Sequence, residues 1–118
     1  MKTYLFVLSK PAHSGAYVQE MLDIILITAA FDQQVSILLL DDGVFHLKKG
    51  QVPDTVGVKD ISAIFRALEI YEVNTIYIER ESLQERGLKP VDLCLPVQEF
   101  YRRDIAGLMK SFDVVFSG

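Results

Sequence analysis

An aliphatic run that ends in two aspartates and a glycine constrains the fold more than any other stretch of this sequence. Residues 35–45 read VSILLLDDGVF. The run is typical of a parallel strand that is buried on both faces, and the polar residues after it mark the strand's exit from the sheet. Open α/β sheets bind ligands and partners at that exit. A polar loop of about a dozen residues follows, which is long for a connection between a strand and a helix and suggests a function for the loop.

Strand and helix patterns alternate along the chain. Five strands are predicted, at residues 3–8, 35–40, 74–78, 91–95 and 114–116. Apolar residues at helical spacing lie between them, at residues 16–31, 61–68 and 101–112, with one or two further helical turns at 81–86. Gly87 is the expected C-terminal cap of those turns. Because crossovers between parallel strands lay helices on the faces of a sheet, the order predicts a three-layer α/β/α fold with a mostly parallel five-stranded sheet.

Length and charge narrow the class of protein. The chain has 118 residues, a hydrophobic fraction of 50% and a net charge of −4. We therefore expect a single domain over residues 1–118 and no direct binding of nucleic acid, which requires clustered Lys and Arg. We expect no membrane span, because the longest apolar stretch outside the strands, residues 24–31, is far short of the roughly 20 residues that cross a bilayer.

The first helix is apolar on more than one side. Ile24, Ile27, Ala30 and Phe31 fall outside its main apolar stripe, and the mean hydropathy of the chain is positive at +0.24. A helix that is apolar nearly all the way round has to be covered on both sides. In a chain of this size, we expect another subunit to supply the second cover.

Cys94 is the only cysteine of the chain, so no internal disulfide can form and a cytoplasmic location is expected. A reactive thiolate requires exposure and a nearby cation or helix N-terminus. Cys94 is instead predicted within a strand, close to Asp92, and is interpreted as a small buried hydrophobe. The alternative is a sulfurtransferase that carries persulfide sulfur on Cys94.

The pair Asp41 and Asp42 has two interpretations. The pair could hold Mg²⁺ or accept a phosphoryl group, which would make the chain a small-molecule or phosphate-binding domain. Alternatively, one aspartate turns the loop while Gly43 adopts a positive φ. His13 and His46 have no second His or Cys at ligand spacing. We expect no metal site and no cofactor.

Two further segments of the sequence are distinctive, DDGVFHLKKGQVPD at residues 41–54 and SLQERGL at residues 82–88. Both resemble motifs of the DsrE/DsrF-like family, and specifically of its DsrF/TusC branch. The branch carries a DGVF…GQ.P loop at the first place and SLRERGL at the second. The resemblance covers most of the chain, since the strand lengths and the apolar first helix also agree, and it implies a DsrEFH-like fold.

The resemblance implies a cytoplasmic subunit of a heterohexameric sulfur-relay complex, built from two copies each of three homologous small proteins. The expected partners are DsrE/TusD-like and DsrH/TusB-like sister subunits, with sulfur-carrier proteins contacting the complex. In the family, persulfide sulfur passes between cysteines on successive proteins. One relay serves 2-thiolation of the wobble uridine in certain tRNAs (TusBCD-like) and another serves intracellular sulfur oxidation (DsrEFH-like). The sequence leaves both open.

The sulfur-carrying relatives have their cysteine just after the third strand, and the resemblance aligns that position with Glu79. A carboxylate cannot carry a persulfide, and Cys94 does not match the position. The expected role is therefore a non-catalytic subunit, with no catalytic residue of its own, inside a sulfurtransferase complex. The first helix and the loop residues Asp41, Asp42, Gly43, Val44 and Phe45 are the expected surfaces of contact with partners.

Overall fold

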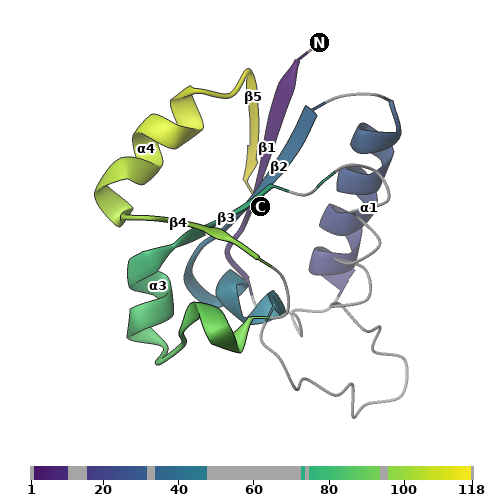
Figure 1. Ribbon diagram of the computed structural model, residues 1–118. Coiled ribbons are helices and arrows are strands. Elements are labelled where there is room, and N and C mark those ends of the chain that lie inside the picture. The colour runs from purple at the N-terminus through teal and green to yellow at the C-terminus, as the bar shows by residue number, and fades with distance from the viewer. Residues whose placement is uncertain are drawn as a thin grey trace.

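Five strands, all parallel, form the centre of the fold (Figure 1). They are β1 (Thr3–Leu8), β2 (Gln34–Leu39), β3 (Ile76–Glu79), β4 (Gln98–Phe100) and β5 (Val114–Ser117). Their order in the sheet is β4-β3-β2-β1-β5, and every neighbouring pair runs parallel. The prediction of a mostly parallel five-stranded sheet is confirmed. Because all five strands are parallel, their carboxyl ends lie at one edge of the sheet, where open α/β proteins bind ligands.

The structure, a computed structural model, describes residues 2–10, 16–31, 34–47, 73, 75–93 and 96–117. The helix expected at residues 61–68 lies outside the described residues. So do Cys94 and His13. Within the described parts, no helix is long and apolar enough to cross a membrane.

The apolar core forms two layers, one on each face of the sheet, because successive side chains of a strand point to opposite faces. Phe6, Leu8, Ile37 and Leu39 pack on one face with buried residues of α1 (Ala16–Ala30). Leu5, Val7 and Leu38 pack on the other face with Ile105 of α4 (Arg102–Lys110). Figure 1 shows α1 and α4 on opposite sides of the sheet. The predicted three-layer arrangement and the burial of the second strand on both faces are thus confirmed.

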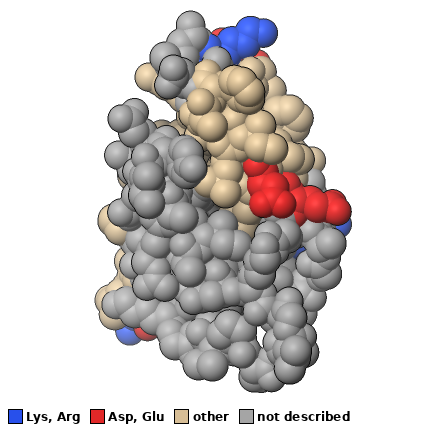
Figure 2. Space-filling model, turned by 90° about the vertical axis from the view of Figure 1, so that its right-hand side faces the viewer, with Lys and Arg blue, Asp and Glu red and all other residues tan. Residues whose placement is uncertain are grey.

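Helix α1 buries one stripe and exposes another apolar one. Leu22, Ile25 and Ala29 face the core. Ile24, Ile27 and Phe31, just past the helix, are 44%, 59% and 73% exposed. Figure 2 views the side of the molecule that α1 occupies, where uncharged side chains dominate the described part and one acidic cluster interrupts them. The sequence prediction that α1 has apolar residues outside its core-facing stripe is confirmed.

The helix after β3 is short and ends in a glycine cap. Helix α3 (Arg80–Glu85) is followed by Gly87 at φ 68°. The N–H of Gly87 donates to Gln84 O (3.2 Å) and that of Leu88 donates to Leu83 O (2.9 Å). These are the two bonds of a Schellman motif, so the predicted role of Gly87 is confirmed.

The prediction of a strand at residues 91–95 is wrong where the structure describes it, at residues 91–93. Pro90–Asp92 form a 3-10 turn, η3, in which the Asp92 carboxylate accepts the N–H of Lys89 (2.8 Å). Val91 is 71% exposed, whereas Leu93 is buried. The fourth strand is β4, whose side chains Gln98 and Glu99 are exposed at the edge of the sheet. An edge strand of this composition carries no apolar signal, which explains the error.

Reciprocal hydrogen bonds tie the last strand to the first. The Asp113 carboxylate accepts the N–H (2.8 Å) and the hydroxyl (3.1 Å) of Thr3, and the N–H of Asp113 donates to Thr3 Oγ1 (3.1 Å). On the α1 side of the sheet, Phe6 of β1 stacks on Phe116 of β5, with ring centroids 5.2 Å apart. These contacts fix β5 as the second edge of the sheet.

Candidate functional site

Polar side chains from three chain segments meet at the carboxyl edge of the sheet. Asp41 and Asp42 follow β2 and begin the 3-10 helix η1 (Asp41–Leu47), Glu79 ends β3, and Arg102 begins α4 after β4. Because β2, β3 and β4 are adjacent and parallel, their ends lie side by side, and α3 brings Ser82 and Arg86 to the same edge. We regard this polar cluster as the candidate functional site.

Glu79 is the centre of the cluster. It is 5% exposed, and its Oε1 accepts hydrogen bonds from Ser82 Oγ (2.6 Å), Arg102 Nε (3.0 Å) and Arg102 Nη2 (2.8 Å). A buried carboxylate is tolerated only when it is paired and hydrogen-bonded. Arg102 also contacts Glu85 through Nη2 (2.7 Å), so its guanidinium bridges two carboxylates across the α3–α4 junction.

Ser82 connects Glu79 to the loop after β2. Its buried hydroxyl donates to Glu79 and accepts the backbone N–H of Asp41 (2.9 Å). Asp41 adopts a positive φ of 50°, which is uncommon outside glycine, although aspartate tolerates it better than most residues. The two hydrogen bonds of the Ser82 hydroxyl therefore hold the start of η1 in a constrained conformation.

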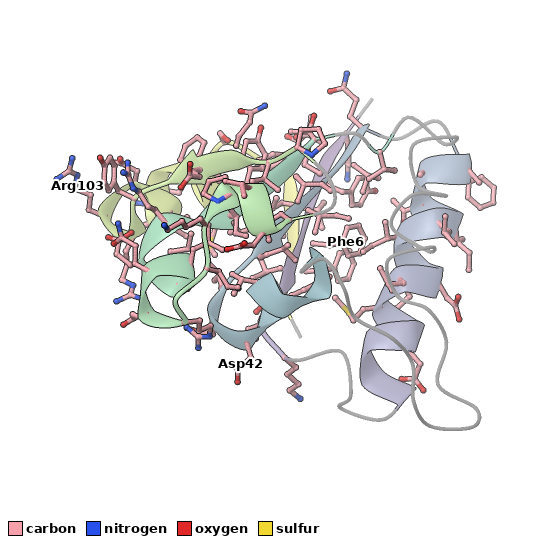
Figure 3. All side chains as sticks on the ribbon, turned by 60° about the horizontal axis from the view of Figure 1, so that its bottom comes forward. Phe6, Asp42 and Arg103 are labelled. Atoms are coloured by element: carbon pink, nitrogen blue, oxygen red, sulfur yellow. The ribbon has the colours of Figure 1, made fainter. Side chains whose placement is uncertain are left out.

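Asp42 lies at the rim of the cluster. Its Oδ1 accepts a hydrogen bond from Arg86 Nε (3.0 Å), and Arg86 Nη1 also donates to Ser82 O (3.2 Å). Figure 3 shows Asp42 pointing away from the body of the molecule. Among the described residues, no group of three His, Cys, Asp or Glu side chains could hold a metal ion. Because Arg86 binds the Asp42 carboxylate, Asp41 and Asp42 do not form a free pair of carboxylates for a cation.

Gly43 is required because the backbone of Leu8 lies close to it, and not because of a positive φ. Gly43 is not among the residues with positive φ, so that part of the sequence interpretation was wrong; Asp41 makes the turn instead. A Cβ atom at Gly43 would overlap the Leu8 carbonyl oxygen and lie 2.7 Å from Leu8 C. Leu8 O also accepts the N–H of Leu40 (3.0 Å). The end of β1 and the start of η1 are therefore in direct backbone contact.

The ionisation of Glu79 is set by opposing effects. Burial raises the pKa of the Glu79 carboxyl, but hydrogen bonds from Arg102 and Ser82 and the charges of Arg102 and Arg86 outweigh burial, so the pKa lies below its usual value. Glu79 is therefore a carboxylate at neutral pH.

We predict that this ionisation contributes to stability in a pH-dependent way. Because the folded-state pKa of Glu79 is lowered, its contribution is fully present above the unfolded pKa, about 4.3, and is lost as pH falls through the folded pKa. Glu79→Gln should therefore be about 1 to 2 kcal/mol less stable than the wild type at pH 7. The two proteins should converge in strong acid, as measured by urea unfolding at several pH values.

The difference in free energy of unfolding between wild type and Glu79→Gln, plotted against pH, isolates the contribution of Glu79. The pKa of Asp113 is also lowered, through its hydrogen bonds from Thr3, but Asp113 is present in both proteins and its contribution cancels. Parallel curves for wild type and Glu79→Gln would show that the ionisation of Glu79 is not coupled to folding.

The structure brings together only part of the site expected from the sequence. Asp41 and Asp42 are exposed, whereas Gly43 and Val44 are buried, and Val44 belongs to the α1-side core. The side chain of Phe45 lies outside the described part. Sequence reasoning missed Ser82, Arg86 and Arg102 as site residues. The first two lie within the SLQERGL segment, whose resemblance to the family could have pointed to them.

Comparisons with known proteins identify a family and several relatives. The sequence profile of the DsrE/DsrF-like family matches residues 2–117. The chain is 43% identical over 93 residues to "Intracellular sulfur oxidation protein DsrF" of Allochromatium vinosum, covering 79% of this chain and 68% of that protein. It is 36% identical over 118 residues to "Protein TusC homolog" of Pseudomonas aeruginosa, covering 99% of each.

A solved structure has the same fold. The crystal structure of the ychN protein from E. coli has a TM-score of 0.83 at 18% identity, with both chains fully covered. The fold and the polar edge define an open, all-parallel α/β protein with a carboxylate cluster at the strand ends. The chain belongs to the DsrE/DsrF-like family.

Proposed function

We propose that this chain is a non-catalytic subunit of a cytoplasmic sulfur-relay complex. The main observation in support of this proposal is the residue at position 79, a glutamate. The family resemblance aligns it with the cysteine of sulfur-carrying relatives, and here the position holds a buried carboxylate engaged by Ser82 and Arg102. A carboxylate forms no persulfide. The cluster around Glu79 instead fixes the relative positions of η1, α3 and α4.

The proposed assembly is a heterohexamer with two copies each of this chain and of two homologous sister subunits, one DsrE/TusD-like and one DsrH/TusB-like. Sulfur-carrier proteins would contact the complex. The names of the relatives, an intracellular sulfur oxidation protein and a TusC homolog, support a relay that serves sulfur oxidation or tRNA wobble-uridine 2-thiolation. The proposal includes both of these relays.

Two surfaces are proposed to meet the sister subunits. One is the exposed apolar face of α1, formed by Ile24, Ile27 and Phe31, which is suited to an interface that excludes water. The other is the start of η1, where Asp41 and Asp42 are exposed and Phe45 follows. Gly43 and Val44 support this second surface from beneath, because both are buried.

We predict that Asp42→Ala weakens assembly with the sister subunits and leaves the melting temperature of the isolated chain nearly unchanged. The exposed ion pair with Arg86 contributes only about 0 to 1 kcal/mol to folding. Phe45→Ala should weaken assembly in the same way. The measurement is co-purification from co-expressing cells, with Glu99→Ala on the edge strand β4 as a matched control. If both loop variants assemble like the control, this loop is not an interface.

Co-expression with the two homologous proteins, followed by native mass measurement, tests the proposed function. A particle with two copies of each chain is the expected result. A chain that stays a lone monomer in the presence of both homologues would contradict the proposal.

A further inference from the structure

An exposed tyrosine with two arginines against it lies beside the candidate site. Arg80 is the first residue after β3 and Tyr101 the first after β4. Glu79 and Phe100 are paired in the register of these parallel strands, so the residues that follow them emerge next to each other. Arg103 joins them from the first turn of α4. We call Arg80, Tyr101 and Arg103 the Arg–Tyr–Arg cluster.

The three side chains are held together by specific contacts. Arg80 Nη1 donates to Tyr101 Oη (3.0 Å), and its Cζ lies 5.2 Å from the centroid of the Tyr101 ring. The Cζ of Arg103 lies 4.7 Å from the same centroid. Both distances are within the range of cation–π interactions. Tyr101 therefore contacts two guanidinium groups, one from Arg80 and one from Arg103.

The charges of these two arginines are not neutralised within the described part of the chain. Arg86 pairs with Asp42, and Arg102 pairs with Glu79 and Glu85. No described carboxylate lies within 4.0 Å of Arg80 or Arg103. Tyr101 is 43% exposed, and Figure 3 shows Arg103 at the periphery, pointing away from the sheet. Two like charges thus contact the same tyrosine ring, and neither forms an ion pair with a described carboxylate.

We infer that the Arg–Tyr–Arg cluster is a docking site for an acidic segment of a protein partner. Guanidinium groups bind carboxylates through paired, charge-assisted hydrogen bonds. The Tyr101 hydroxyl accepts from Arg80 and so keeps its own proton to donate. Tyrosine and arginine are also the residue types that contribute most to binding energy at protein interfaces.

The surroundings of the cluster favour a peptide over a nucleic acid. The exposed carboxylates Glu85, Glu99 and Asp104 belong to the same elements, α3, β4 and α4, and the whole chain carries a net charge of −4. A nucleic-acid backbone needs an extended basic surface to neutralise successive phosphates. A local pair of cations suits one or two carboxylates on a short segment.

The cluster is separate from the α1 face and from Asp42, so this inference does not rest on the proposed function. It can be tested with the isolated full-length chain and a fluorescein-labelled hexaglutamate peptide, whose binding is followed by anisotropy. A hexaglutamine peptide is the uncharged control. We expect Arg80→Ala and Arg103→Ala each to weaken hexaglutamate binding about tenfold, the loss expected for a charge-assisted hydrogen bond.

Lys110→Ala is the matched control variant. Lys110 is an exposed cation at the end of α4, so its removal changes the net charge equally without touching the cluster, and we expect less than about a twofold effect. An equal loss for Lys110→Ala, or equal binding of the two peptides, would overturn the inference. Tighter binding of a labelled single-stranded RNA than of hexaglutamate, lost in Arg103→Ala, would also overturn it in favour of a phosphate ligand.

Discussion

Replacing Gly43 by alanine should lower the free energy of unfolding by about 3 kcal/mol, the upper range for forcing extra atoms into a packed site. The added methyl group would overlap the carbonyl oxygen of Leu8, which is backbone and cannot rotate away as a side chain could. Relief requires the end of β1 and the start of η1 to separate. The hydrogen bond from Leu40 N–H to Leu8 O would then be strained as well. Urea unfolding of the isolated chain measures the effect.

Two other glycines provide controls for the same substitution. Gly107 lies within α4 with nothing within 4 Å of an added Cβ, so Gly107→Ala should stabilise the helix by about 0.5 to 1 kcal/mol. Gly87 also has open space but a φ of +68°, so Gly87→Ala should cost about 1 kcal/mol through backbone strain alone. If Gly43→Ala costs no more than Gly87→Ala, the β1–η1 contact is not tight.

Placing charges on the exposed face of α1 should strongly weaken assembly without unfolding the chain. Ile24 and Ile27 are exposed in the isolated chain, yet the proposal buries them against a sister subunit. The double variant Ile24→Lys, Ile27→Lys should weaken assembly at least about a hundredfold, because two ammonium groups would have to be desolvated in an apolar interface. Native mass measurement of the co-expressed proteins reports the effect.

The lysine substitutions are chosen to preserve the helix. Positions 24 and 27 lie four residues after Glu20 and Asp23, so each new ammonium has a carboxylate one turn earlier, an order that supports a helix. The melting temperature of the isolated chain should therefore stay close to that of the wild type. Gln84→Lys with Gln98→Lys adds the same charge at exposed positions on α3 and β4. Normal assembly of the α1 variant, or equal loss in this control, would remove α1 from the proposed interface.

The sequence predicts the fold wherever burial dictates composition. The aliphatic run of β2 is buried on both faces and was recognised as such. The strand β4 was missed, because an exposed edge strand can be polar. A strand was predicted at residues 91–95 instead, where Pro90 starts a 3-10 turn.

The candidate site was predictable only in part. Asp41 and Asp42 were found because they end a buried strand, and Glu79 because of the family resemblance. Arg102 lies 23 residues from Glu79, and nothing in the spacing shows that a crossover places its guanidinium on that carboxylate. A positive φ was predicted at Gly43 from residue propensity, whereas the structure has it at Asp41, whose N–H donates to Ser82. Both the Arg102–Glu79 pair and the Asp41–Ser82 hydrogen bond join segments that are far apart in the sequence.

Labelled sulfur can show directly which subunit of the complex becomes persulfidated. The purified complex would be incubated with a cysteine desulfurase, pyridoxal phosphate and sulfur-labelled cysteine, and each subunit would then be analysed by intact mass. We expect persulfide sulfur on a sister subunit and none on this chain, because Glu79 replaces the thiol. A persulfide on this chain that is lost in Cys94→Ser would contradict the proposed non-catalytic role and make the chain a sulfur carrier.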